Sequence, residues 1–284
     1  ASTPVGGTEK SVQSITMNDI KDYFNENISP QVSHFHVAGK MTQRSIEKSL
    51  KQLSQNWVGS DVEIPEIKTS KPPVRSQVYF IDIPGAKQSA ITLGTLSIPG
   101  GNPELYKYSV VNNRLGGGME ARLMRTLRLE KGYTYGAGSF FRENSYQTPF
   151  YAYSQVRSNV TLESLEIFKN IINSYAESYN SEDLELTKNK LIKQNALRFE
   201  RLGSLLNMLD TISKFNFPDT YIQEQQDVLR SMNLEDAKSI AQSEFNADKM
   251  NFVIAGDAKT QLSRIKELGY GNPIMLNREG NTIK

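Results

Sequence analysis

Two stretches of this sequence occur twice, and the same distance separates the copies in both cases. Residues 16–21 (TMNDIK) resemble residues 233–238 (NLEDAK), and residues 35–39 (FHVAG) resemble residues 252–256 (FVIAG); the offset is 233 − 16 = 217 and 252 − 35 = 217. Each copy predicts a helix, a short loop, an apolar strand ending in Ala-Gly and a further helix. Identity between the copies is sparse and chance similarity is the alternative, but the constant offset and the matching element order favour a repeat.

A repeat of this length predicts one complete domain and part of another. We expect residues 1–58 to be the C-terminal part of a preceding homologous α/β domain, most of which would lie upstream of residue 1. Residues 59–75 are rich in Pro, Ser and Lys and predict a linker. Residues 76–284 then form the complete copy.

The order of elements in the complete copy predicts an α+β fold. Strand pairs come first, a helical block follows, and a strand returns near the end, which is typical of a two-layer helix/sheet sandwich with helices on one sheet face. Strands are expected at 77–83, 89–98, 133–142, 148–157 and 250–255, and helices at 103–115, 119–131, within 161–245 and at 259–268.

Charge and composition exclude several classes of function. The 33 Lys and Arg nearly balance the 31 Asp and Glu, and a net charge of +2 gives no electrostatic basis for binding nucleic acid or an acidic membrane surface. No apolar run approaches the roughly 18 residues of a membrane-spanning helix. The absence of cysteine excludes disulfides and thiolate metal sites.

The sequence also lacks the ligands of a catalytic zinc. Such a site needs about three protein ligands, usually with histidine among them. The only histidines are His34 and His36, two apart on an expected strand and therefore on one face. A two-histidine site completed by a carboxylate is geometrically possible, but structural strand histidines are the simpler interpretation. Neither His-Glu-x-x-His nor His-x-x-Glu-His occurs, so this chain alone is not expected to be a zinc hydrolase.

Other catalytic arrangements are also missing. There is no Gly-x-Ser-x-Gly elbow, and the complete copy has no histidine to act as its base. Carboxylates such as Glu185 and Glu200 fit the solvated faces of amphipathic helices. The run Gly116–Gly118 lacks the Lys and Ser/Thr that follow the glycines of a phosphate-binding loop, so it predicts a sharp turn instead.

One segment carries a family signature. Residues 115–136, LGGGMEARLMRTLRLEKGYTYG, contain a Gly-rich turn, a helix ending in Leu-Arg-x-x-x-Gly-x-x-Tyr, and the start of a strand. This segment resembles the insulinase/pitrilysin family of zinc metallopeptidases, which includes the mitochondrial processing peptidases. Arg128 and Tyr135 are seven residues apart, as the family's Arg and Tyr are.

The resemblance implies a divided active site. Family members consist of two halves, each of two related domains, that face each other around a chamber. One half holds zinc through His-x-x-Glu-His, and the second domain of the other half contributes the Arg and the Tyr. By position these are Arg128 and Tyr135, so the expected role of this chain is to bind unfolded peptide while zinc lies on a partner subunit or an upstream segment. The alternative is a non-proteolytic peptide-binding or scaffold subunit, which some family relatives have become.

The chemistry of the two side chains suits that role. Arginine offers five N–H donors and tyrosine one O–H donor, so both can hydrogen-bond a peptide carbonyl or the oxyanion that develops from it. The sequence departs from the usual Gly-Leu-Ala-Tyr pattern, because Tyr133 replaces Leu and Thr134 replaces Ala. If neighbouring side chains in this strand alternate, Tyr133 shares a face with Tyr135, and only the motif separates the two.

Overall fold

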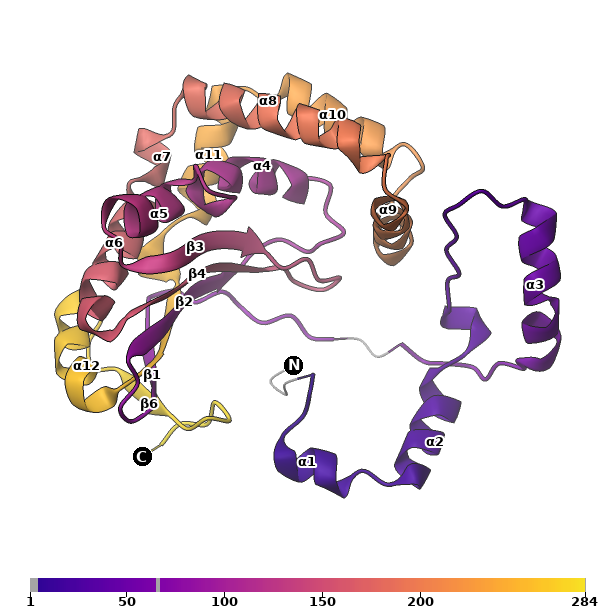
Figure 1. Cartoon of the computed structure of the whole chain (residues 1–284), viewed down its shortest axis with the longest axis horizontal. Coiled ribbons are helices and arrows are strands. Elements are labelled where there is room, and N and C mark those ends of the chain that lie inside the picture. Colours follow the sequence, from indigo (N-terminus) through magenta and orange to yellow (C-terminus); the bar gives the residue numbers. More distant parts are fainter. Residues whose placement is uncertain (1–4, 65–66, 284) are drawn as a thin grey trace. The chain divides into compact units, whose positions relative to one another are not determined.

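The computed structural model describes residues 5–64 and 67–283 (Figure 1). The chain divides into two compact units, one of residues 1–67 with 197–214 and one of residues 68–196 with 215–284. In the described residues, no helix is both long enough and apolar enough to cross a lipid bilayer.

The second unit is built on one six-stranded sheet in the order β3-β4-β2-β5-β1-β6. Its strands are β1 (Val78–Asp82), β2 (Gln88–Leu96), β3 (Thr134–Phe141), β4 (Pro149–Arg157), β5 (Asn251–Gly256) and β6 (Ile274–Leu276). Strand β1 runs parallel to β5 and β6, whereas β2 is antiparallel to β4 and β5 and β3 is antiparallel to β4. Strand β3 therefore forms one edge of the sheet.

Helices cover one face of this sheet (Figure 1). Alternate strand residues such as Phe80, Leu93, Phe150 and Phe252 are fully buried beneath them. The helices of this unit are α4 (Leu105–Gly116), α5 (Arg122–Met124), α6 (Thr161–Asn173), α7 (Tyr175–Ser178), α8 (Ser181–Arg198), α10 (Tyr221–Ser231), α11 (Leu234–Glu244) and α12 (Ala258–Ile265), the last two residues of α8 belonging to the other unit. The predicted two-layer α+β architecture is thus confirmed.

The described residues of the first unit form helices and no sheet. Its helices are α1 (Glu9–Ser14), α2 (Met17–Asn27), α3 (Gln43–Asn56) and α9 (Leu202–Phe215), the last residue of α9 belonging to the other unit. The two segments related by the 217-residue offset begin with the same kind of cap: Thr16 caps α2 with Asp19, and Asn233 caps α11 with Asp236, each as a capping box.

The prediction of a strand over residues 35–39 is wrong, because this segment does not pair with any strand in the described structure. Its counterpart β5 is central in the sheet and is hydrogen-bonded on both sides. His34 and His36 lie in this unpaired segment with their rings stacked, 6.2 Å apart at an interplanar angle of 7°. An isolated extended segment has unpaired N–H and C=O groups, so the same local sequence becomes a strand only where neighbours exist.

Candidate functional site

The Gly-rich turn, residues 116–118, begins in close contact with strand β3. Gly116 ends α4 so close to the strand that a Cβ atom there would lie 2.1 Å from the Ser139 backbone nitrogen. Asn112 of α4 donates from Nδ2 to the Ser139 carbonyl at 2.9 Å and accepts from the Ser139 hydroxyl at 2.5 Å. These contacts protect part of the open edge of the sheet and fix where the chain leaves α4.

The segment carrying Arg128 is a short helix that widens into a π-helix. After α5 the chain continues as the π-helix η2 (Arg125–Glu130), a form that is rare and often found at functional sites. Leu123 and Leu127 are fully buried, and Arg128 follows at the partly exposed side. The Arg128 guanidinium donates from Nη1 to the sulfur of Met119 at 3.5 Å.

A glycine in the left-handed backbone conformation connects this helix to the strand. Gly132 has φ +63°, a conformation that only glycine adopts without strain, and its N–H donates to the Arg128 carbonyl. The π-helix η2 packs against β3, which starts two residues later. Arg128 and Tyr135 therefore lie on adjacent, packed elements, as the motif predicted for their position in the fold.

A bulge at the start of β3 aims Tyr135 at solvent. The pairing of β3 with β4 shifts register between Thr134 and Ala137. The Thr134 hydroxyl donates to the Gln155 carbonyl at 2.6 Å and accepts the Gly136 N–H at 3.0 Å, and the Ser154 hydroxyl donates to the Gly136 carbonyl at 2.9 Å. Thr134, one of the two residues that depart from the family pattern, thus stabilises the bulge.

The structure distinguishes the two tyrosines that the motif could not separate. Tyr135 is 89% exposed, whereas Tyr133 is half-buried against the hydrophobic core. Tyr133 lies before the strand begins and the bulge interrupts the alternation, so the two rings do not share an exposed face. Of the two, Tyr135 is the more accessible to a large ligand.

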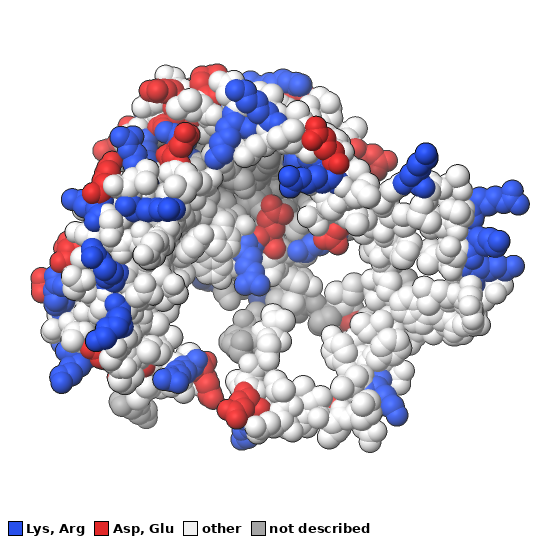
Figure 2. All heavy atoms as spheres, in the orientation of Figure 1, with Lys and Arg blue, Asp and Glu red and all other residues white. Residues whose placement is uncertain are grey.

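Tyr135 lines a shallow cleft on the face of the sheet opposite the helices. The cleft is bordered by polar side chains and backbone from β2, β3 and β4, among them Gln88, Thr92, Ser154 and Gln155. The cleft therefore offers both hydrogen-bonding groups and an aromatic surface, since Tyr153 also lines it. Figure 2 shows acidic and basic side chains interspersed over the helical layer.

No metal centre accompanies this site within the described part of the chain. Across residues 5–64 and 67–283, no three His, Cys, Asp or Glu side chains gather closely enough to hold a metal ion. The two histidines lie in the first unit and Arg128 and Tyr135 in the second.

Comparison with known proteins finds a protein family and relatives that match most of this chain. The family model described as the peptidase M16 inactive domain matches residues 14–191. Similar sequences include a non-peptidase homolog, YmxG, of Helicobacter pylori (24% identical over 271 residues) and an uncharacterized zinc protease, YmxG, of Bacillus subtilis (22% over 253 residues). These alignments cover 91% and 86% of this chain, but the chain spans only 61% and 59% of those proteins.

A solved structure shares the fold. The peptidase M16 inactive domain from Pseudomonas fluorescens superposes with a TM-score of 0.80 at 23% sequence identity. The match covers 89% of this chain and 61% of that chain. At this identity the likeness concerns the fold alone.

Proposed function

Because the chain belongs to the peptidase M16 inactive-domain family, as the motif over residues 115–136 predicted, we propose that it is the non-zinc half of a zinc-dependent metalloendopeptidase. The zinc motif lies on another subunit or on an upstream segment, and the chain is not active alone. Arg128 and Tyr135 bind the backbone of an unfolded peptide and stabilise the oxyanion that forms on the scissile carbonyl. Zinc on the partner half supplies the activated water.

The observation that carries this proposal is the exposure of Tyr135 at a cleft. A tyrosine that serves only the fold usually buries its ring, yet this one is 89% exposed and is held there by a hydrogen-bonded bulge. Arg128, on the adjacent π-helix, has no carboxylate within ion-pair distance among the described residues, so its charge is available to a ligand. An arginine without an acidic partner and an exposed phenol suit a developing negative charge.

The test is mutation of both donors in the assembly with the zinc-bearing half. Arg128→Ala and Tyr135→Phe should each lower peptide cleavage at least about tenfold, since loss of one oxyanion donor typically costs about 10²- to 10³-fold. The chain offers matched controls. Arg125→Ala removes an arginine of the same π-helix that pairs with Glu130, and Tyr133→Phe removes the half-buried phenol. Unchanged turnover in both test variants, or equal loss in the controls, would refute the assigned roles.

We also propose that residues 1–58 are the C-terminal part of a preceding homologous domain, joined by a linker (59–75) to the complete domain of residues 76–284. Support comes from comparing burial across the 217-residue offset. Four large side chains of the first copy are 51–64% exposed, although the matching positions in the second copy are buried. The pairs are Ile20 with Ala237, Tyr23 with Ile240, Phe24 with Ala241, and Phe35 with Phe252. A complete helix/sheet core of the kind that buries Ala237 and Phe252 would cover these side chains.

The second candidate function is a peptide-binding or scaffold subunit without proteolysis. It is favoured by one relative, which is named a non-peptidase homolog. Co-purification with a subunit bearing His-x-x-Glu-His, followed by cleavage of an unfolded peptide, distinguishes the two. If peptide is bound but never cut in that assembly, the scaffold role is correct.

A further inference from the structure

Helix α8 holds the Gly-rich turn from outside the sheet. The buried carboxylate of Asp183 accepts from Arg114 Nε at 3.0 Å and from Arg122 Nη2 at 2.6 Å. Arg114 precedes the three glycines and Arg122 follows them, so one carboxylate ties together both ends of the turn. Asp183 is itself fixed, because it forms reciprocal hydrogen bonds with Asn180 at the start of α8.

A second anchor lies two turns further along the same helix. Lys190 donates from Nζ to the Gly117 carbonyl and to Asn113 Oδ1, both at 3.1 Å. Residues seven apart share a helix face, so Asp183 and Lys190 present one polar face of α8 to the turn. Lys190 also places a positive charge at the C-terminal end of α4, where backbone carbonyls lack partners.

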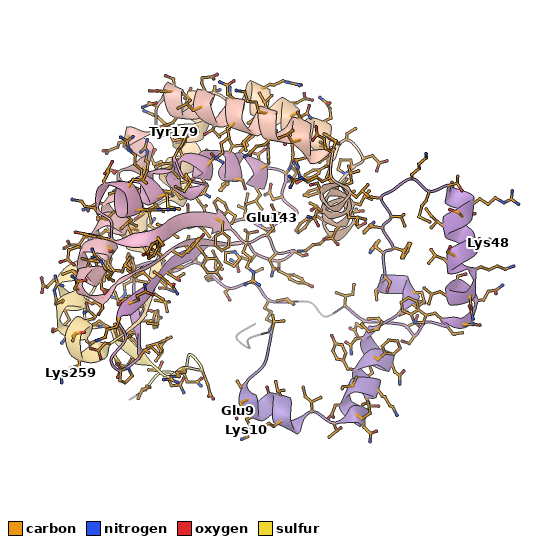
Figure 3. The ribbon with its side chains drawn as sticks, viewed as in Figure 1. Glu9, Lys10, Lys48, Glu143, Tyr179 and Lys259 are labelled. Atoms are coloured by element: carbon orange, nitrogen blue, oxygen red, sulfur yellow. The ribbon has the colours of Figure 1, made fainter. Side chains whose placement is uncertain are left out.

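The Arg122 side chain lies near the surface, yet it contacts two residues of α7 in addition to Asp183. Its guanidinium stacks over the Tyr175 ring at 4.8 Å and donates to the hydroxyl and the carbonyl of Ser178. The Tyr175 hydroxyl in turn donates to the Val111 carbonyl of α4 at 2.6 Å. Figure 3 labels Tyr179, the buried ring that lies between α7 and α8 and contacts Tyr175 edge-on.

These anchors reach Arg128 by two routes. Arg122 is the first residue of the helix that continues into the π-helix carrying Arg128. Met119, whose sulfur contacts the Arg128 guanidinium, lies in the turn that Asp183 and Lys190 hold. The backbone of Arg128 therefore continues from a helix that α8 anchors, and its guanidinium contacts a turn that α8 also anchors.

We propose that Asp183 is a positioning residue that sets the direction of the Arg128 guanidinium toward bound peptide. The inference rests on the proposed function, because it assumes that Arg128 binds substrate. Desolvation offsets much of the attraction within a buried ion pair, so net stability alone gives a weak reason for placing a carboxylate between two arginines. Fixing the geometry of a binding group gives a stronger one.

The test is a double-mutant cycle on peptide affinity, measured with the full chain. Fluorescence anisotropy with fluorescein-labelled β-casein, a largely unfolded polypeptide, gives Kd for the wild type, Asp183→Asn, Arg128→Ala and the double variant. Each single change should weaken binding about tenfold, which corresponds to the loss of one charged hydrogen bond. The double variant should bind no more weakly than Arg128→Ala, because Asp183 acts only through Arg128.

The outcomes separate the two proposals. If Arg128→Ala leaves Kd unchanged, the proposed function fails. If Arg128→Ala weakens binding but Asp183→Asn does not, or if the two effects multiply, the positioning role is overturned and the proposed function stands. Glu163→Gln, which breaks the ion pair with Arg264 on α12, is the matched control and should not change Kd. If Asp183→Asn fails to fold by circular dichroism, Lys190→Met replaces it in the cycle with the same expected result.

Discussion

At the scale of single residues, the carboxyl group of Glu244 is largely removed from water, which disfavours its charged form. Glu244 ends α11 beside the aromatic core, and its Oε1 atom has no hydrogen-bond partner among the described residues. Burial raises the pKa of Glu244 to about 7 and outweighs the lowering effect of the nearby Ser97 hydroxyl. The native state therefore favours the protonated form, whereas the unfolded chain ionises near the ordinary value of 4.5.

The sign of the resulting pH dependence follows from proton binding. Between pH 4.5 and about 7 the native state holds a proton that the unfolded state has lost, so stability falls as pH rises through this window and levels off above it. The loss is on the order of 3 kcal/mol, at about 1.4 kcal/mol for each unit of pKa difference. We expect Glu244→Gln to remove this decline, as measured by urea unfolding at a series of pH values.

An exposed carboxylate of the same helix gives the control for this prediction. Glu235→Gln changes the first turn of α11 at the surface and should leave the decline in place. A Glu244→Gln variant that still loses stability between pH 4.5 and 7 would show that another group is responsible.

At the scale of elements, the close contact between α4 and β3 requires a residue without a side chain at position 116. A Cβ atom on Gly116 would meet the nitrogen and the hydroxyl of Ser139 at 2.1 and 2.2 Å, and neither the strand nor the helix end can move freely. We predict that Gly116→Ala lowers the free energy of unfolding by about 3 kcal/mol, at the upper end of typical overpacking. Chemical denaturation measures this loss directly.

Gly203 on α9 provides the matched control, because nothing lies within 4 Å of a Cβ atom there. Gly203→Ala should stabilise the helix by up to about 1 kcal/mol through propensity alone. Equal effects of the two alanine substitutions would contradict the close approach of α4 to β3.

The elements also show what local sequence can and cannot predict. The hairpin of β3 and β4 was predicted almost to its ends, because alternating apolar residues and a polar loop are local signals. Three features escaped prediction: the three-residue strand β6, the π-helix around Arg128 and the missing strand at residues 35–39. Each depends on what packs beside it, and the same holds at the candidate site. The motif identified Arg128 and Tyr135, but only the bulge at Thr134 separates Tyr135 from Tyr133.

At the scale of the whole molecule, the two units differ in how much they bury. In the described part of residues 1–67 the one buried residue is Ser29, and no apolar side chain there is buried. The second unit holds the entire six-stranded sheet and the large hydrophobic core beneath its helices. Stability scales with apolar area removed from water, so almost all of it is expected to reside in the second unit.

Deletion of residues 1–67 is therefore predicted to leave a chain that still unfolds cooperatively. A loss below about 1 kcal/mol corresponds to a change of Tm within roughly 4 °C for a domain of this size, and calorimetry resolves that change. Removal of residues 251–284 is the contrasting deletion, because it takes away β5, which pairs with β1 on one side and β2 on the other. That shorter deletion should abolish the transition altogether. If deletion of residues 1–67 also abolished it, residues 76–284 could not be the complete domain that the repeat predicts, and the first unit would belong to the same cooperative structure.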